Sequence, residues 1–179
     1  MSRYNLKSRR SYADGHNRYL PTIVVVSIGL MVAIVFLGYM IRKKTPVTFE
    51  TVWETVEKNG FKPIDITEKH KTVSNGIEKC LGFKSDDINF VFFTAIDKEH
   101  AENICKKSLY SEIRKKTSRY YDYRRSDGDG GTNYYILALS GDGNWGIAYY
   151  VENTGGIAWC KKENASAIAD ILREIGYVD

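Results

Sequence analysis

Hydrophobic and polar residues alternate along this chain in blocks that predict one long apolar helix followed by a mixed domain. Residues 19–41 contain no charged side chain, and Arg18 and Arg42 flank them. A bilayer core about 30 Å thick needs roughly 20 apolar residues in a helix that rises about 1.5 Å per residue. The segment therefore predicts a transmembrane helix. It is longer than the apolar region of a cleaved secretory signal and ends in bulky residues, so we expect it to remain as an anchor.

Three later stretches carry apolar residues at helical spacing. Thr48, Asp97 and Asn164 are suitable N-caps for them, and Gly60 ends the first. Each stretch has one apolar stripe: Phe49, Val52, Trp53 and Val56 in the first, Ala101, Ile104, Cys105, Leu109 and Ile113 in the second, and Ile168, Ile171, Leu172 and Ile175 in the third. The stripes predict three helices that each bury one side.

Strand patterns fill the intervals between these helices. Apolar, aromatic and β-branched residues predict six strands, at 64–67, 77–83, 88–96, 134–139, 145–151 and 157–160. Short polar turns join several of them, so neighbouring strands should be antiparallel. The sequence thus predicts an α+β domain, with an antiparallel sheet of about five to six strands and two to three helices that cover one face.

These patterns divide the chain into four parts: a basic tail at 1–18, a transmembrane helix at 19–41, a linker at 42–47 and the α+β domain at 48–179. Within the apolar segment, Gly29 and Ala33 form a pair of small residues that would let two helices approach closely. A homodimer through this pair is therefore one expectation, beside contact with the lipid bilayer.

Charge is distributed unevenly along the chain. The net charge is +4, but the positive excess lies in the tail and residues 42–44, and the domain that follows is acidic overall. More Lys and Arg residues precede the apolar segment than follow it closely, which predicts a cytoplasmic N-terminus. We therefore expect a single-pass protein of the cell membrane with its domain on the extracytoplasmic side.

The three cysteines bear on the same question. An odd number leaves at least one thiol free, which favours a reducing compartment, in contrast to the charge distribution. Cys105 lies on an apolar helix stripe, as expected of a buried small hydrophobe. Cys80 and Cys160 lie in predicted strands, and the sequence leaves open whether they pair.

One segment of the domain combines cations with aromatic rings. Residues 114–125 hold a single acid, Asp122. Ammonium and guanidinium groups attract phosphates, and aromatic rings offer stacking surfaces. We hypothesise a polyanion-binding segment made of Arg114, Lys115, Lys116, Arg119, Tyr120, Tyr121, Tyr123, Arg124 and Arg125. The alternative is a solvated helix end, where cations suit the helix dipole, that continues into a loop.

The expected partner of this segment depends on the side of the membrane. An exported domain would meet anionic lipid, a wall polymer or an envelope protein. A domain that faces the cytoplasm could meet nucleic acid through the same phosphate contacts.

Sites for catalysis, metals and cofactors are not expected. Asp127–Gly131 is similar to the start of a calcium loop, but Thr132 and Ala138 occupy positions that require Gly and Glu. His16, His70 and His100 lack metal-ligand spacing, and no nucleophile or phosphate-loop motif is present. An anchored enzyme with an unrecognised site is the alternative.

Short features spread over the domain resemble those of a known group of proteins. They are Phe49, Gly60-Phe61, Asp65-Ile66-Thr67, the aromatic strand at Phe90–Phe93, Asp97, Asn133-Tyr134-Tyr135 and Gly176-Tyr177. Together they resemble small uncharacterised α+β domains that follow a single anchor in membrane proteins and lipoproteins of Gram-positive bacteria. The resemblance covers most of residues 48–177 and implies an exported domain without a known activity. We therefore expect a membrane-anchored protein that presents a non-catalytic binding or interaction domain.

Overall fold

The structure, a computed structural model, describes residues 25–34, 43–73, 75–85, 87–116, 122–126 and 133–178. The chain forms two compact units, residues 1–42 and 43–179. In the first unit, residues 25–34 form a helix with exposed side chains. Among the described residues, no helix is both long enough and apolar enough to span a membrane. The remainder of the predicted span and the basic tail lie outside these residues, so the anchor stays a prediction, as does a dimer through Gly29 and Ala33.

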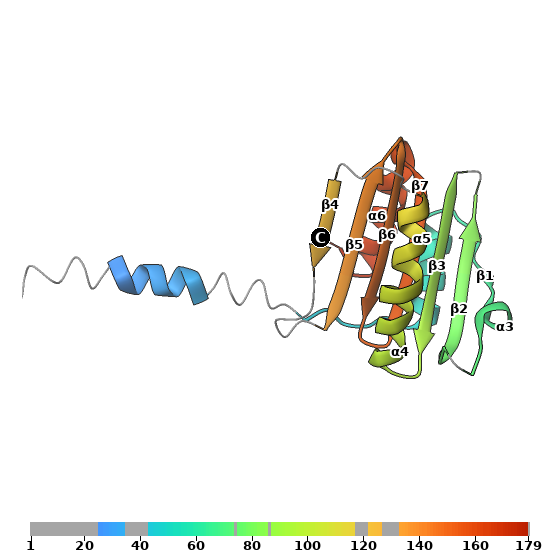
Figure 1. Cartoon of the computed structure of the whole chain (residues 1–179), viewed down its shortest axis with the longest axis horizontal. Coiled ribbons are helices and arrows are strands. Elements are labelled where there is room, and N and C mark those ends of the chain that lie inside the picture. The colour runs from blue at the N-terminus through green and yellow to red at the C-terminus, as the bar shows by residue number, and fades with distance from the viewer. Residues whose placement is uncertain are drawn as a thin grey trace, which may run out of the picture. The chain divides into compact units, whose positions relative to one another are not determined.

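Antiparallel strands form one sheet in the second unit. In the part of this unit that the structure describes, there are seven strands in the order β1-β2-β3-β7-β6-β5-β4 (Figure 1). They are β1 (Ile64–Asp65), β2 (Ile77–Lys84), β3 (Ile88–Ala95), β4 (Asp122–Ser126), β5 (Tyr134–Gly141), β6 (Asn144–Val151) and β7 (Thr154–Lys161). The six strands expected from the sequence are all present, which confirms the α+β class.

The seventh strand, β4, corrects the sequence interpretation. Residues 122–126 were not among the predicted strands, but they pair with β5, with Tyr123 opposite Leu139 and Arg125 opposite Leu137. An edge strand needs only one hydrogen-bonded neighbour, and charged residues are common in such strands. A polar segment can therefore extend a sheet without an alternating apolar pattern.

Helices cover both faces of the sheet, whereas the sequence predicted one covered face. Figure 1 shows α4 and α5 on one face and α6 on the other. The helical segments are α2 (Phe49–Lys58), α3 (Thr67–His70), α4 (Lys98–Asn103), η1 (Ile104–Leu109), α5 (Tyr110–Lys116), η3 (Lys162–Asn164) and α6 (Ala165–Glu174). Strand β6 shows why both faces are covered, because it is buried from Gly146 to Val151 without alternation.

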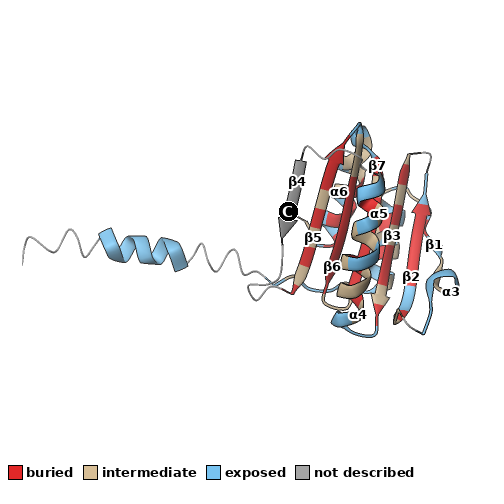
Figure 2. Ribbon diagram, in the orientation of Figure 1, coloured by how far each residue is buried: buried red, intermediate tan, exposed pale blue. Residues whose placement is uncertain are grey.

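Two cores result, one on each side of the sheet. Helices α2 and α6 contribute Val52, Val56 and Ile171 to the first core, which includes Phe90 and Tyr149 of the sheet. The continuous helix α4-η1-α5 contributes Ala101, Cys105 and Ile113 to the second core. Figure 2 shows buried residues along most of β5 and β6, between these two helical layers.

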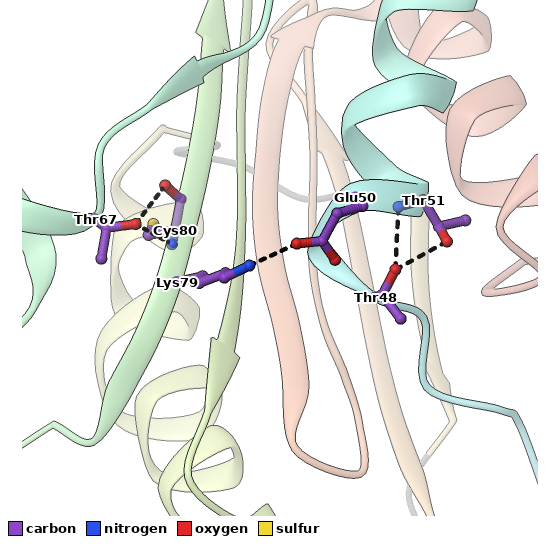
Figure 3. Close-up of polar contacts among 6 residues, drawn as sticks. All are labelled: Thr48, Glu50, Thr51, Thr67, Lys79 and Cys80. Carbon is purple, nitrogen blue, oxygen red and sulfur yellow. Dashed lines mark hydrogen bonds and ion pairs between the residues drawn. The ribbon is translucent and has the colours of Figure 1, made fainter.

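Polar contacts fix the beginning of α2. The Thr48 side chain caps the helix by accepting a hydrogen bond from the Thr51 amide at 3.2 Å (Figure 3). In the first turn, the Glu50 carboxylate pairs with Lys79 of β2 at 2.5 Å. The predicted helix start at Thr48 is thus confirmed.

All three cysteines are free and buried. Cys80 lies in the second core and Cys160 in the first, on opposite faces of the sheet. They are also separated by β3, where Cys80 is opposite Phe93 and Cys160 is opposite Ile88. The question of their pairing is settled by this geometry, because no disulfide can cross a sheet between such positions.

Candidate binding groove

A groove lies over β2, β3 and β7 on the face that carries the helix α4-η1-α5. Its cavity volume is about 540 Å³, within the range of roughly 300–1,000 Å³ that is typical of small-molecule sites. One wall is formed by η1 and α5 and the other by β1 and α3. The lining includes Ile66, Lys69, His70, Cys80, Gly82, Lys84, Asn89, Val91, Ile104, Ser108, Leu109, Glu112 and Trp159.

The floor of the groove is apolar, and a glycine lowers it. A Cβ atom at Gly82 would lie 2.9 Å from Cδ1 of Ile66, so the missing side chain is what lets Ile66 pack across β2. Val91 and Trp159 continue this floor and are half-buried. A glycine inside a strand often marks such a close approach.

The helical wall contains a π-helix, η1, where the sequence predicted a regular α-helix. The amide of Tyr110 donates to the carbonyl of Cys105, five residues earlier, as a π-helix requires. Ile104 and Leu109 are also five residues apart, and both line the groove and are half-buried. The wider turn therefore directs two apolar side chains toward the groove, and π-helical turns are frequent at functional sites.

The two ends of the groove carry different charges. At one end, α3 supplies Lys69 and His70, both exposed. This end is beside Cys80, because the Cys80 amide donates a hydrogen bond to the hydroxyl of Thr67, at the start of α3, at 2.9 Å (Figure 3). Among the described residues, Lys69 has no ion-pair partner within 4.0 Å.

The opposite end combines a cation with an acid. Lys84 and Asn89 face each other across β2 and β3, and Asn89 is opposite Trp159. Glu112 reaches the same end, because its neighbour Ile113 packs over Gly146, which pairs with Trp159. The groove thus has a cationic end at α3 and a mixed end at α5.

Asn75 organises the loop beside the cationic end. Its side-chain oxygen accepts hydrogen bonds from the amides of Thr72 and Ile77, each at 3.1 Å, and its side-chain nitrogen donates to the carbonyl of His70 at 2.6 Å. These contacts connect His70 and Thr72 to the beginning of β2. The carbonyl of His70 is therefore hydrogen-bonded to Asn75, and both residues line the groove.

The thiol of Cys80, at the base of the groove, has low reactivity. Burial, and secondarily the nearby Asp65 carboxylate, raise the pKa of the Cys80 thiol to about 12. A thiol needs its thiolate form to act as a nucleophile, and this form is scarce near neutral pH at such a pKa. The Cys80 thiol is therefore a poor nucleophile near neutral pH.

Arg114 and Lys115 of the hypothesised polyanion-binding segment are not among the residues that line this groove. Arg114 and Lys115 are exposed near the end of α5, and the Arg114 guanidinium lies 5.5 Å from the ring centre of Tyr110. Lys116 is the last residue of α5, and β4 includes Tyr123, Arg124 and Arg125. Arg119, Tyr120 and Tyr121 lie outside the described residues, as does the Asp127–Gly131 loop.

Metal ligands do not gather anywhere in the described part of the chain, since no group of three or more His, Cys, Asp or Glu residues could hold an ion there. The two described histidines differ in their surroundings. His70 lines the groove, and Nδ1 of His100 lies 2.8 Å from Oδ1 of Asp97.

Comparisons with known proteins identify no family. No family model matches the chain. No curated protein matches it either. Among solved structures, it is similar to a protein described as a GTP binding regulator from Thermotoga maritima, with 12% identity and a TM-score of 0.43, over 76% of this chain and 94% of that one.

Proposed function

We propose that this protein is a single-pass membrane protein whose domain, residues 43–179, binds an elongated apolar ligand in the groove between η1–α5 and β1–α3. The observation that carries the proposal is the groove itself, with a volume of about 540 Å³ and an apolar floor. Small-molecule sites typically combine an apolar lining with a few polar groups at the edge. The described lining has this composition.

Exposed apolar surface in the groove also favours a ligand. Val91, Trp159, Ile104 and Leu109 are only half-buried, although each contacts the second core. Removal of such surface from water is worth about 25 cal/mol per Å². An apolar ligand that covers these side chains would gain this energy without rearrangement of the fold.

Membrane anchoring is supported by the apolar segment 19–41 and its basic flanks. The fold begins almost directly after this segment, because the backbone of Lys44 already exchanges two hydrogen bonds with the Asn133 side chain, at 2.9 and 2.7 Å. Extraction of membranes at alkaline pH tests the anchor. The full chain should stay with the membranes and a chain without residues 19–41 should be released, whereas release of both would contradict anchoring.

The extracytoplasmic orientation is tested by trypsin treatment of intact cells. The basic segment between Arg114 and Arg125 provides several cleavage sites. Cleavage of the domain in intact cells supports the proposed orientation. Cleavage only after lysis would reverse it and would make nucleic acid the more suitable partner for the basic segment.

Binding in the groove is tested with a variant that fills it. Ser108 is exposed on the helical wall and lines the groove, so Ser108→Phe should place a ring over the floor. We expect full-length protein in lipid nanodiscs to bind the neutral fluorophore 1-aminoanthracene, and Ser108→Phe to weaken binding about tenfold or more, in keeping with the loss of about 1.4 kcal/mol or more.

Ser111→Phe is the matched control. Ser111 is exposed on the same helix but does not line the groove. This variant should bind like the wild type, after subtraction of the signal from empty nanodiscs. Equal binding by all three proteins would contradict the proposal.

A polyanion-binding role for the segment that begins at Arg114 is the second candidate. The exposed positions of Arg114 and Lys115 favour it. Replacement of all six Lys and Arg residues between positions 114 and 125 by Gln should then abolish binding to polyanions and leave aminoanthracene binding unchanged. The two sites are thus separable.

A further inference from the structure

The two ends of the groove differ in charge. Its α3 end presents the ammonium group of Lys69 and the imidazole of His70, and its only described acid, Glu112, is at the opposite end. An ammonium without a counter-charge attracts an anion, while a mixed end such as that of Lys84 and Glu112 has little net preference.

The acids on the outer side of α3 form no ion pair with Lys69. Asp65, Glu68 and Glu78 border a separate hollow that Lys69 also reaches. The Asp65 carboxylate is instead engaged by the Thr67 amide at 2.8 Å, and hydrogen bonds from Thr67 lower the pKa of Asp65.

We propose that the ligand of the groove is a single-chain amphiphile with one anionic head group, such as a fatty acid. The head group lies at Lys69 and His70, and the chain extends over Val91 toward Trp159. This assignment rests on the proposed function, since it names the ligand of the same groove.

The dimensions of the groove suit such a chain. The floor positions from Cys80 to Lys84 cover about 13 Å of strand at roughly 3.3 Å per residue. Apolar contacts line both walls through Ile66 and Leu109. A flexible acyl chain can follow this path, whereas a second head group would have to lie beside Glu112.

Three ligands of equal chain length separate charge from apolarity. Decanoate, decanol and decyltrimethylammonium compete with 1-aminoanthracene on full-length protein in phosphatidylcholine nanodiscs, with empty nanodiscs as the blank. We expect decanoate to bind about three- to tenfold more tightly than decanol at low salt, and the cation to bind more weakly than both. Because Lys69 is exposed, the preference should shrink at high ionic strength.

Single substitutions locate the head group. Lys69→Gln should reduce the preference for decanoate over decanol to less than about twofold and leave the affinity for decanol unchanged. Lys84→Gln removes the same charge from the other end of the groove and should preserve the preference. Both side chains are exposed, so neither variant should affect folding.

Each outcome bears on the proposal. Equal binding of decanoate and decanol would overturn the anionic ligand and leave the apolar groove in place. Loss of the preference in Lys84→Gln rather than in Lys69→Gln would overturn the position of the head group. Failure of all three ligands to displace the fluorophore would overturn both this inference and the proposed function.

Discussion

Tyr149 and Tyr177 are both buried in the first core, but only the Tyr177 hydroxyl has hydrogen-bond partners among the described residues. The Tyr149 hydroxyl is buried and has no hydrogen-bond partner among the described residues. Burial raises the pKa of Tyr149 well above 10, so the group is a neutral phenol. An unpaired buried hydroxyl costs roughly 1–3 kcal/mol of desolvation free energy.

Tyr149→Phe should therefore leave the stability of the domain unchanged or increase it, by up to about 1–3 kcal/mol. The substitution keeps the ring and removes the unpaired group. Urea unfolding of the full-length protein, followed by circular dichroism, measures the change. A clear loss of stability would mean that the hydroxyl has a partner that this account lacks.

Gly156 is needed because the Val91 carbonyl and the side chain of Tyr149 both lie too close to it for a Cβ atom. The two residues are opposite each other in β6 and β7. A Cβ atom at position 156 would lie 2.5 Å from the Tyr149 hydroxyl oxygen and would collide with the Val91 carbonyl. A glycine at this position thus makes room for an aromatic ring of the neighbouring strand.

Gly156→Ala should cost about 1–3 kcal/mol or more, as expected for overpacking of a core. Gly146→Ala is a suitable comparison, because its Cβ atom would have no neighbour nearer than 3.4 Å. Thermal unfolding of both variants tests the difference. Equal melting temperatures would contradict the close approach of Tyr149.

At the scale of elements, Tyr177 joins the two ends of the domain to the sheet. Its hydroxyl accepts a hydrogen bond from the Val47 amide at 3.0 Å and contacts the Thr154 hydroxyl, at the start of β7, at 2.5 Å. Tyr177 is fully buried, and its ring packs edge-on against Tyr149 at 5.6 Å. Tyr177, which follows α6, thus connects the segment before α2 to the beginning of β7.

Tyr177→Phe should destabilise the domain by about 1–3 kcal/mol, because it leaves the Val47 amide and the Thr154 hydroxyl without this partner. The expected sign is opposite to that of Tyr149→Phe in the same core. Hydrogen exchange should also become faster at the Val47 amide. Equal stability of the wild type and the Tyr177 variant would contradict this role.

Elements with a strong apolar period were predictable from the sequence, and elements without one were not. The stripe of Phe49, Val52 and Val56 predicted α2, and the aromatic run at Phe90–Phe93 predicted β3; both are confirmed. Strand β4 was missed because polar edge strands carry no alternation. The π-turn in η1 was missed because the spacing of Ile104, Cys105 and Leu109 also fits an α-helix.

At the scale of the whole molecule, the groove could not be predicted from the sequence. It depends on how the helix α4-η1-α5 packs on the sheet. Both faces of the sheet are covered, and the helix α4-η1-α5 contacts β7 and β6 more than β2, which leaves part of β2 and β3 open. The local indication in the sequence was Gly82, which interrupts the apolar residues Leu81 and Phe83 of β2, since a glycine inside a strand suggests a close approach of another group. The remaining lining residues come from segments far apart in the chain.

Photolabelling tests the central claim, that the groove binds an apolar chain, most directly. A decanoate analogue with a diazirine at the end of its chain is bound to full-length protein in nanodiscs and activated by light, and the labelled peptides are identified by mass spectrometry. We predict labelling near Trp159 and on Ile104–Leu109 and α5, and its loss in Ser108→Phe but not in Ser111→Phe. Labelling of α2 and α6 to the same extent as these peptides, or its persistence in Ser108→Phe, would contradict the account.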